Sequence, residues 1–370
     1  MPGSRVLKEI RKSLPADWYY DADHYLRELE AIWYRDWFCV GRSESLANPG
    51  DFFLAEIGDQ SIVLTRNTQG DLRAFHNTCR HRGSVLCREK SGHFRNGSII
   101  CPYHTWTYST DGELLKTPGR IEAGRFEYDE YSLHAVNIDT WGGFLFINLS
   151  HEPASGLDEF LGDEAECLAN WPIETMQSVH QETRRVACNW KLFWENYSEC
   201  YHCPRLHPEL CRIMPVYKHA VFDCADLPID RGVSRVAEGV RTWTIDGQSD
   251  LPPIEGPSPA VLDEGAIFAS FTASMFVVAH TDYVRSARIV PTGPESIELI
   301  VDWMLPRGAE YSRQDLDRML ELARIVISQD GEICELNQRG LHSLSFDEGV
   351  LVGQEYQLWH FHEWLRSRLA

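Results

Sequence analysis

Two short motifs, each pairing one cysteine with one histidine, constrain this chain more than any other feature of its sequence. The first is Cys79-x-His81 and the second is Cys101-x-x-His104, with nineteen residues between them. Two thiolates and two imidazoles can close a tetrahedral zinc site, but zinc fingers usually pair Cys with Cys and His with His. The mixed order also suits a two-iron cluster in which one iron takes both sulfurs and the other takes both imidazoles. Two neutral histidines in place of thiolates raise the reduction potential of such a cluster.

The residues around both motifs resemble the two cluster-binding loops of a Rieske [2Fe–2S] domain. The resemblance rests on His81-Arg82-Gly83 and on the run from Cys101 to Trp106, and it extends over residues 37–150. Gly83 would supply the backbone freedom that a loop tip needs. Cys87 fits no ligand position, and we expect it to be a buried thiol. The ligands that the resemblance implies for one [2Fe–2S] cluster are Cys79, His81, Cys101 and His104.

The distribution of apolar residues predicts two domains and an N-terminal helical segment. Short β-like runs broken by Gly, Asn, Pro and Asp predict a small all-β domain at 37–150. Residues 1–36 have apolar positions at helical spacing, and we expect them to pack on the second domain. In residues 151–370, helical patterns interleave with β-like runs, which predicts an α+β domain of antiparallel sheet with helices. The strands expected there are 181–188, 267–278, 283–290 and 296–304.

Two helical patterns in the second domain bear on the chemistry. The first covers about 189–202 and should end near His202, because Pro204 cannot sit inside a helix without loss of a hydrogen bond. On one continuous helix, His202 and His207 would point about 140° apart, so the break is what lets them converge. The second pattern covers about 312–336, with Ser312 as its expected N-cap. Residues 225–259 are rich in Gly, Pro and Asp, and a long surface loop is expected there.

Two carboxylates stand beside these histidines. Glu195 and Glu199 are four residues apart on one helix face, and Glu199 is three residues before His202. Like charges at this spacing mildly destabilise a helix, which favours a functional site. The alternative is an ordinary solvent-exposed face in which Lys191 partly compensates Glu195.

Two imidazoles plus one carboxylate, with open positions left over, form the iron site of non-haem Fe(II) oxygenases. Asn189-Trp190-Lys191, followed by Glu-Asn-x-x-Glu-x-x-His-x4-His ending at His207, resembles the catalytic motif of Rieske non-haem iron oxygenase α subunits. The resemblance implies a helix-grip-like catalytic domain, with His202 and His207 as iron ligands and Asn196 lining the site. It implies Glu199 as an acidic bridge that receives electrons from His104 of a neighbouring subunit.

The third iron ligand must come from far downstream. Residues 329–341 resemble the C-terminal segment in which an Asp near the start binds iron, and Asp330 takes that position. From the residues alone, Glu332 and Glu335 compete with it, because all three acids stand on one predicted helix.

Composition and missing motifs set the expected partners. No Gly-rich dinucleotide fingerprint follows a predicted strand, so NAD(P)H and flavin should sit on a separate reductase. The bridge requires another copy of the chain, and the family norm is a homotrimer.

The 55 acidic and 35 basic residues give a net charge of −20, which argues against a nucleic-acid or anionic-membrane partner. Residues 1–15 contain no apolar signal region, so we expect a cytoplasmic protein. Its eleven cysteines should serve metals or the core and not a disulfide framework.

The segment Glu199-Cys200-Tyr201-His202-Cys203-Pro204 and the tail at 335–341 most resemble the subgroup that N-demethylates glycine betaine, proline betaine and related quaternary ammonium compounds. Hydroxylation of an N-methyl carbon gives a carbinolamine that loses formaldehyde. Aromatic faces would hold the cation, or each ring could simply pack in the core. The candidate rings are Trp194, Tyr201, Phe268, Phe271 and Phe276.

Two other functions stay open from the sequence. The first is oxygenation or O-demethylation of an aromatic acid by the same irons, for which Arg205 is a candidate anion-binding residue. The second is a non-enzymatic electron carrier whose second domain has lost iron. Such a carrier would hold about two irons per chain instead of about three.

Overall fold

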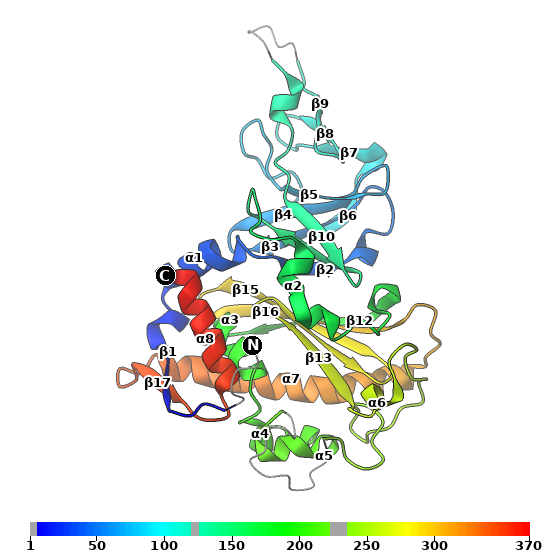
Figure 1. Cartoon of the computed structure of the whole chain (residues 1–370). Helices are drawn as coiled ribbons and strands as arrows, with labels where there is room; N and C mark the ends of the chain where they lie inside the picture. Colours follow the sequence, from blue (N-terminus) through cyan, green and yellow to red (C-terminus); the bar gives the residue numbers. More distant parts are fainter. Residues whose placement is uncertain (1–5, 120–125, 223–234) are drawn as a thin grey trace. The chain divides into compact units, whose positions relative to one another are not determined.

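The computed structural model describes residues 6–119, 126–222 and 235–370, and it divides into two compact units (Figure 1). The small unit is Ile32–Phe160, and the large unit joins Met1–Ala31 to Leu161–Ala370. The division therefore falls inside helix α2 (Leu157–Glu166), whereas the sequence placed it at residue 150. Among the described residues, no helix is both long enough and apolar enough to cross a membrane.

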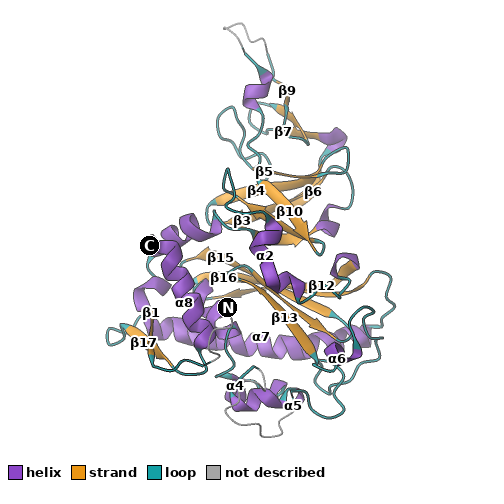
Figure 2. Cartoon of the chain, in the orientation of Figure 1, coloured by secondary structure: helices purple, strands orange, loops and turns teal. Residues whose placement is uncertain are grey.

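The small unit is built from three antiparallel sheets, drawn as orange strands in Figure 2. This agrees with the expected all-β fold class. In spatial order, the sheets are β10 (Asn137–Trp141), β11 (Phe144–Asn148) and β2 (Phe38–Arg42); β5 (Leu72–His76), β4 (Gln60–Arg66), β3 (Asp51–Ile57) and β6 (Ser91–His93); and β7 (Ser98–Ile100), β8 (Thr107–Ser109) and β9 (Leu114–Lys116).

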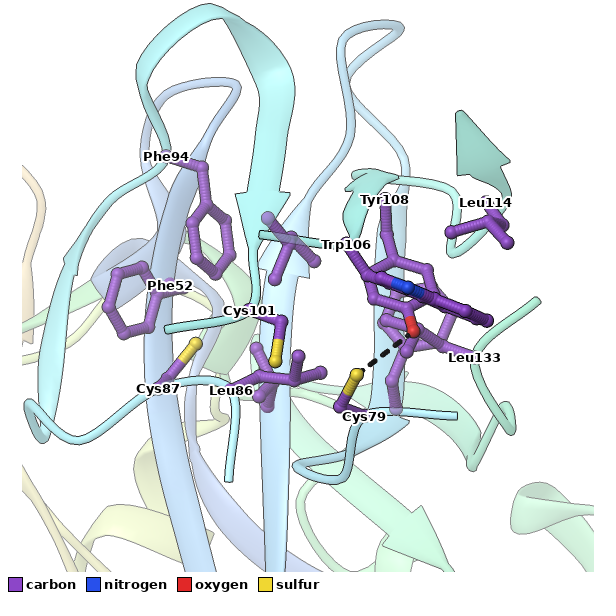
Figure 3. Packing of buried hydrophobic residues seen from close by; sticks show 13 residues of the cluster. Phe52, Cys79, Leu86, Cys87, Phe94, Cys101, Trp106, Tyr108, Leu114 and Leu133 are labelled. Atoms are coloured by element: carbon purple, nitrogen blue, oxygen red, sulfur yellow. Dashed lines mark hydrogen bonds between the residues drawn. The ribbon is translucent and has the colours of Figure 1, made fainter. Parts of the chain in front are cut away.

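The core of the small unit contains the cysteines of both Cys–His motifs (Figure 3). Phe52 and Phe94 stack with ring centroids 4.3 Å apart, and Cys87 is buried beside them as expected. Burial raises the pKa of the Cys87 thiol to about 12, which keeps it protonated and unreactive. Because Cys79 and Cys101 belong to the same core, its packing also holds the two motif loops in place.

The large unit is organised around a five-stranded antiparallel sheet. Residues 267–278, expected to be one strand, form a hairpin that turns at 272–274, where Ala273 has a φ of 74°. The apolar pattern continues through this turn, so it does not reveal the reversal. The strands in spatial order are β12 (Met176–Val186), β16 (Ser296–Pro306), β15 (Val284–Gly293), β14 (Met275–His280) and β13 (Ala266–Phe271).

Two helices place functional residues against this sheet. Helix α7 (Arg313–Leu341) contacts β12 and α3 (Trp190–Tyr197), and α3 contacts β15. The expected N-cap of α7 is confirmed: Ser312 Oγ accepts from Asp315 N–H, and the Asp315 carboxylate accepts from Ser312 N–H. Within the described residues, the other α-helices that lie wholly in the large unit are α1 (Ala22–Glu28), α4 (Cys203–Leu206), α5 (Leu210–Ile213), α6 (Pro259–Leu262) and α8 (Tyr356–Leu369).

The N-terminal segment contains a strand in addition to the expected helix. Strand β1 (Arg11–Pro15) pairs with β17 (Glu348–Leu351), a partner that local periodicity cannot reveal. The loop expected at 225–259 falls partly outside the described residues; from 235 on it runs without regular structure until α6.

A buried ion pair ties α1 to α3. Lys191 Nζ lies 2.6 Å from Glu28 Oε1, and neither side chain is exposed to solvent. Glu28 also accepts hydrogen bonds from Trp190 Nε1 at 2.8 Å and from His24 Nε2 at 3.1 Å. Burial opposes the charge on Glu28, but Lys191 and His24 outweigh it and hold the pKa of this carboxyl below its usual value. Lys191 therefore neutralises mainly Glu28, and its weaker electrostatic interaction with Glu195 is the partial compensation that was expected.

Candidate metal centres

The two Cys–His motifs form loops with the same backbone hydrogen-bond pattern. In each loop the cysteine N–H donates to the carbonyl of the residue five positions later at 2.8 Å. The fourth residue after the cysteine donates its own N–H back to the cysteine carbonyl at 3.0 Å. That fourth residue has a positive φ in both cases, 71° at Gly83 and 56° at Thr105. Gly83 adopts this conformation without steric cost, as the sequence predicted. The repeated pattern brings Cys79 and Cys101 to the core side of two matching loops.

The loops bring the four expected donors together. His81 Nδ1 and His104 Nδ1 are 3.1 Å apart, and the thiols of Cys79 and Cys101 are close enough to interact. The cysteines are almost fully buried, while His81 is exposed and His104 half-buried. The result is a sulfur pair on the inside and an imidazole pair on the outside. This donor set fits a [2Fe–2S] cluster with sulfur ligands on one iron and nitrogen ligands on the other.

Tyr108 supports the sulfur side of this centre. Its hydroxyl accepts a hydrogen bond from Arg80 N–H at 3.1 Å, so its own proton is free to donate to Cys79 Sγ at 3.3 Å (Figure 3, dashed line). Hydrogen bonds to cluster sulfurs tune the reduction potential. On the other side, the His81 ring stacks on Trp106 at 4.7 Å. Tyr108 was not predicted from the sequence, because its only local signal is its position two residues after Trp106.

The segment expected to be one helix up to His202 is two helices. Helix α3 already ends at Tyr197, where the Ser198 hydroxyl donates to the Trp194 carbonyl at 2.7 Å. Pro204 lies in the first turn of α4. Backbone N–H groups of the first turn have no partner within the helix, so the N–H that proline lacks is not needed there. Pro204 therefore helps to start a helix and does not end one. His202 and His207 flank α4 at its two ends, which gives them the freedom to converge.

Three donor atoms converge on one point at this site. His202 Nε2 and His207 Nε2 are 3.2 Å apart, and Asp330 Oδ1 on α7 lies 2.9 Å from His207 Nε2 and 3.6 Å from His202 Nε2. Asp330 Oδ1 is buried and makes no hydrogen bond of normal geometry with any described residue, despite these short distances. An oriented carboxylate oxygen and two imidazole nitrogens fit an iron ion with open positions.

The other ring nitrogen of each histidine has an acceptor of its own. His202 Nδ1 lies 2.5 Å from Glu199 Oε1, and His207 Nδ1 lies 2.8 Å from Gln329 Oε1. Donation from Nδ1–H leaves the Nε2 lone pair of both rings available to a metal. Burial opposes a charge on His202, but Asp330 and Glu199 outweigh it and raise its pKa to about 9. Gln329 was not predicted as a functional residue from the sequence, although it directly precedes Asp330.

The other acids of the region lie elsewhere. Glu195 accepts hydrogen bonds from Tyr19 Oη at 2.7 Å and from His362 Nε2 at 2.9 Å. The side chains of Glu195 and Glu199 are only 12% and 13% exposed, so the alternative of a solvent-exposed face was wrong. Glu332 is exposed, and Glu335 accepts from the backbone N–H of Ala187 at 3.1 Å. Asp330 is therefore the acid on α7 that faces the two histidines.

Cys200 and Cys203 form a disulfide on either side of His202. We had expected the cysteines to serve metals or the core, so this pairing is a correction. The turn between α3 and α4 brings the two Cα atoms to 5.0 Å, within the range that a disulfide requires.

Two cavities meet at Asn196, Glu199 and His202. The aromatic cavity has a volume of about 80 Å³, and the three converging donors line it. The larger cavity has a volume of about 560 Å³, and Tyr19, Glu195 and His362 are among its lining residues. The rings of the aromatic cavity are Phe193, Tyr197, Tyr217, Phe222, Trp243, Phe268 and Phe276.

The lining of the aromatic cavity differs from the set of pocket residues expected from the sequence. Phe268 and Phe276 line it, whereas Trp194 and Phe271 are buried elsewhere and Tyr201 is exposed. Arg205, the expected anion-binding residue, is exposed and absent from the lining. A different arginine, Arg285 on β15, lines the cavity.

Comparison with known proteins agrees with this geometry. The profile of the Rieske [2Fe–2S] domain matches residues 36–127, and that of the ring hydroxylating alpha subunit (catalytic domain) matches residues 173–370. The chain belongs to the Rieske oxygenase α-subunit family. It is an enzyme of the oxidoreductase class, and its cofactors are a [2Fe–2S] cluster and a mononuclear non-haem iron.

Relatives of this Rieske oxygenase cover nearly its whole length. It is 30% identical to the glycine betaine monooxygenase oxygenase subunit of Chromohalobacter salexigens, over 91% of this chain and 81% of the relative. It is 28% identical to the chloroplastic choline monooxygenase of Beta vulgaris, over 96% and 76% of the two chains. The crystal structure of the quaternary ammonium Rieske monooxygenase CntA with L-carnitine has the same fold. Its TM-score is 0.74 at 22% identity, and the match covers 98% of this chain and 96% of that one.

Proposed function

We propose that this Rieske oxygenase hydroxylates an N-methyl group of a betaine-type quaternary ammonium compound and thereby releases formaldehyde. The observation that carries this proposal is the convergence of His202, His207 and Asp330 on one wall of a small aromatic cavity. The names of the relatives, glycine betaine monooxygenase and choline monooxygenase, support the same class of substrate.

The proposal assigns the two metal centres to the residues described above. Iron bound at His202, His207 and Asp330 would supply O2 activation, with electrons from a cluster bound at the Cys–His loops. Asp330 and the two imidazoles, which are part of the cavity lining, would hold the metal there. Asn196 Nδ2 lies 3.4 Å from His202 Nε2 and lines both cavities, so it can orient a polar group beside the metal.

Glu199 is the residue that we assign to the path of electrons into the iron site. Its carboxylate accepts from His202 Nδ1–H and from the backbone N–H groups of Tyr201 and His202. We assign it as the bridge to His104 of a neighbouring copy in a homotrimer. A separate NAD(P)H-dependent flavin reductase would reduce the cluster.

The aromatic cavity suits a small cation. Aromatic faces attract quaternary ammonium groups, and the rings of Trp243 and Phe268 lie 5.9 Å apart at the cavity lining. A volume of about 80 Å³ is far below the roughly 300–1,000 Å³ of pockets for drug-sized ligands. This size favours a betaine over a polycyclic substrate.

The test supplies reconstituted protein with NADH, O2 and a generic reductase. We expect formaldehyde release and O2 uptake in about equal amounts with glycine betaine or a related betaine, because each hydroxylation consumes one O2 and frees one carbon. Turnover of aromatic acids alone, with no betaine oxidised, would replace this proposal with the aromatic-acid alternative.

A further inference from the structure

The aromatic cavity contains a buried guanidinium group that has no counter-ion among the residues that the structure describes. Arg285 on β15 is only 7% exposed, and its Nε has no hydrogen-bond partner in the described part of the chain. No carboxylate among the described residues forms an ion pair with it. Arg288, three residues further along the strand, differs because it lies 3.7 Å from Asp302 Oδ2. An unpaired buried guanidinium is costly, and this cost indicates a ligand-binding role.

The strand register explains why Arg285 faces the cavity. Arg285 is paired with Val278 on β14, and Val278 is paired with Phe268 on β13. Side chains alternate across a strand, so Phe276, two residues before Val278, lies on the same face of the sheet. Arg285, Phe268 and Phe276 all line the aromatic cavity. One cavity therefore contains a guanidinium group and a set of aromatic faces.

The nearby acid cannot serve as the permanent partner of this arginine. Asp330 lines the same cavity. Burial lowers the pKa of Arg285, and Asp330 is close enough to act in the opposite direction. Its Oδ1 atom, however, points toward His202 and His207. A metal at those donors would neutralise Asp330 and leave the guanidinium with still less compensation.

We infer that Arg285 binds the carboxylate of the substrate, so that the substrate is a zwitterion with a quaternary ammonium group and a carboxylate. This inference rests on the proposed function and narrows it. Arginine binds carboxylates through two parallel hydrogen bonds, and the pairing would satisfy the buried donors of Arg285. A purely cationic substrate such as choline would instead place a second positive charge in a cavity that already holds one.

The inference is tested by ligand binding to iron-loaded protein without O2. Glycine betaine and choline share the trimethylammonium group, but glycine betaine has a carboxylate where choline has a hydroxymethyl group. Binding is followed by calorimetry and by the tryptophan fluorescence of the chain, to which Trp243 at the cavity lining contributes. We expect wild type to bind glycine betaine at least about tenfold more tightly than choline, in line with a charge-assisted hydrogen bond.

Three variants separate the carboxylate contact from general effects. Arg285→Gln should weaken glycine betaine binding about tenfold to a hundredfold and leave choline binding equal or tighter. Arg285→Lys keeps the charge without the bidentate geometry and should lie between. Arg205→Gln, an exposed arginine outside the lining, is the matched control and should bind both ligands as wild type does. Thermal melts and iron content check that each variant is folded.

The outcomes distinguish this inference from the proposed function. Equal wild-type affinity for choline and glycine betaine, or unchanged betaine affinity in folded Arg285→Gln, overturns the role of Arg285. Oxidation of choline but not of betaines keeps quaternary ammonium chemistry but overturns both the carboxylate assignment and the betaine substrate of the proposed function. Oxidation of betaines with unchanged betaine affinity in folded Arg285→Gln overturns the role of Arg285 alone. If wild type neither binds nor oxidises any quaternary ammonium compound, the proposed function and this inference both fail.

Discussion

Glu199 contacts both His202, a proposed iron ligand, and the backbone of the turn that presents it. Glu199→Gln keeps the size of the side chain but removes the negative charge next to His202 Nδ1, which lies 2.5 Å away. We expect both metals to stay bound and electron arrival at the iron to slow by about tenfold or more. The measurement is single-turnover reoxidation of the reduced cluster, followed by absorbance. Glu332→Gln, an exposed acid on α7, is the control. Cluster reoxidation at the wild-type rate in Glu199→Gln would remove Glu199 from the electron path.

Gln329 holds the second imidazole. Its Oε1 accepts from His207 Nδ1–H at 2.8 Å, and its Nε2 donates to Glu209 Oε2 at 3.2 Å, so the amide orientation is defined. Gln329→Leu should weaken iron affinity about tenfold to a hundredfold, because the His207 ring loses its orientation. Iron titration of the metal-free site measures this, with the absorbance of the cluster in the same chain as internal control. Unchanged iron affinity would show that His207 is oriented by packing alone.

At the residue scale, the sequence predicted those proposed ligands that are close together in the chain. His202 and His207 stand in one short motif, and the Cys–His pairs stand in two. Arg285, Tyr108 and Gln329 escaped prediction because their roles depend on which face of a strand or helix meets a partner far away. Arg285 in particular is separated from Asp330 by the whole of β16 and half of α7, and only the register of the sheet shows its place.

At the element scale, the buried pair Lys191–Glu28 joins α1 to α3, the helix that leads into the iron site. Lys191→Met leaves the Glu28 carboxylate buried without its ammonium partner and should cost about 3–5 kcal/mol of stability in the large unit. The double variant Glu28→Gln, Lys191→Met should lose much less, since no charge stays buried. Urea unfolding followed by circular dichroism measures both. A loss below about 1 kcal/mol in Lys191→Met would contradict this account of the pair.

Helices and strands could be predicted from the periodicity of apolar residues, whereas the turns at which the chain changes direction could not. Helix α7 and its Ser312 cap were predictable because the cap and the apolar face are local features. The break between α3 and α4 was misplaced, because Pro204 can start a helix as well as stop one. The hairpin at 266–280 was read as one strand because its turn carries no strong Gly or Pro signal. Neither error affected the prediction that His202 and His207 lie close together.

At the scale of the whole molecule, the bridge proposed for Glu199 requires electrons to pass between copies of the chain. Co-expressed His104→Ala and His202→Ala chains should form mixed trimers in which one copy supplies the cluster and its neighbour the iron. Random mixing should restore about a quarter of wild-type formaldehyde release, although each variant alone is inactive. Activity no higher than that of the separate variants would confine electron transfer to one chain or exclude the oligomer.

Iron and sulfide analysis, combined with EPR, tests the central claim that this chain holds two different iron centres. We expect about three irons and about two sulfides per reconstituted chain, with the spectrum of a reduced Rieske cluster. His202→Ala should fall to about two irons and keep that spectrum, because the cluster ligands are on other loops. Zinc at Cys79, His81, Cys101 and His104, or loss of the cluster spectrum in His202→Ala, would contradict the account.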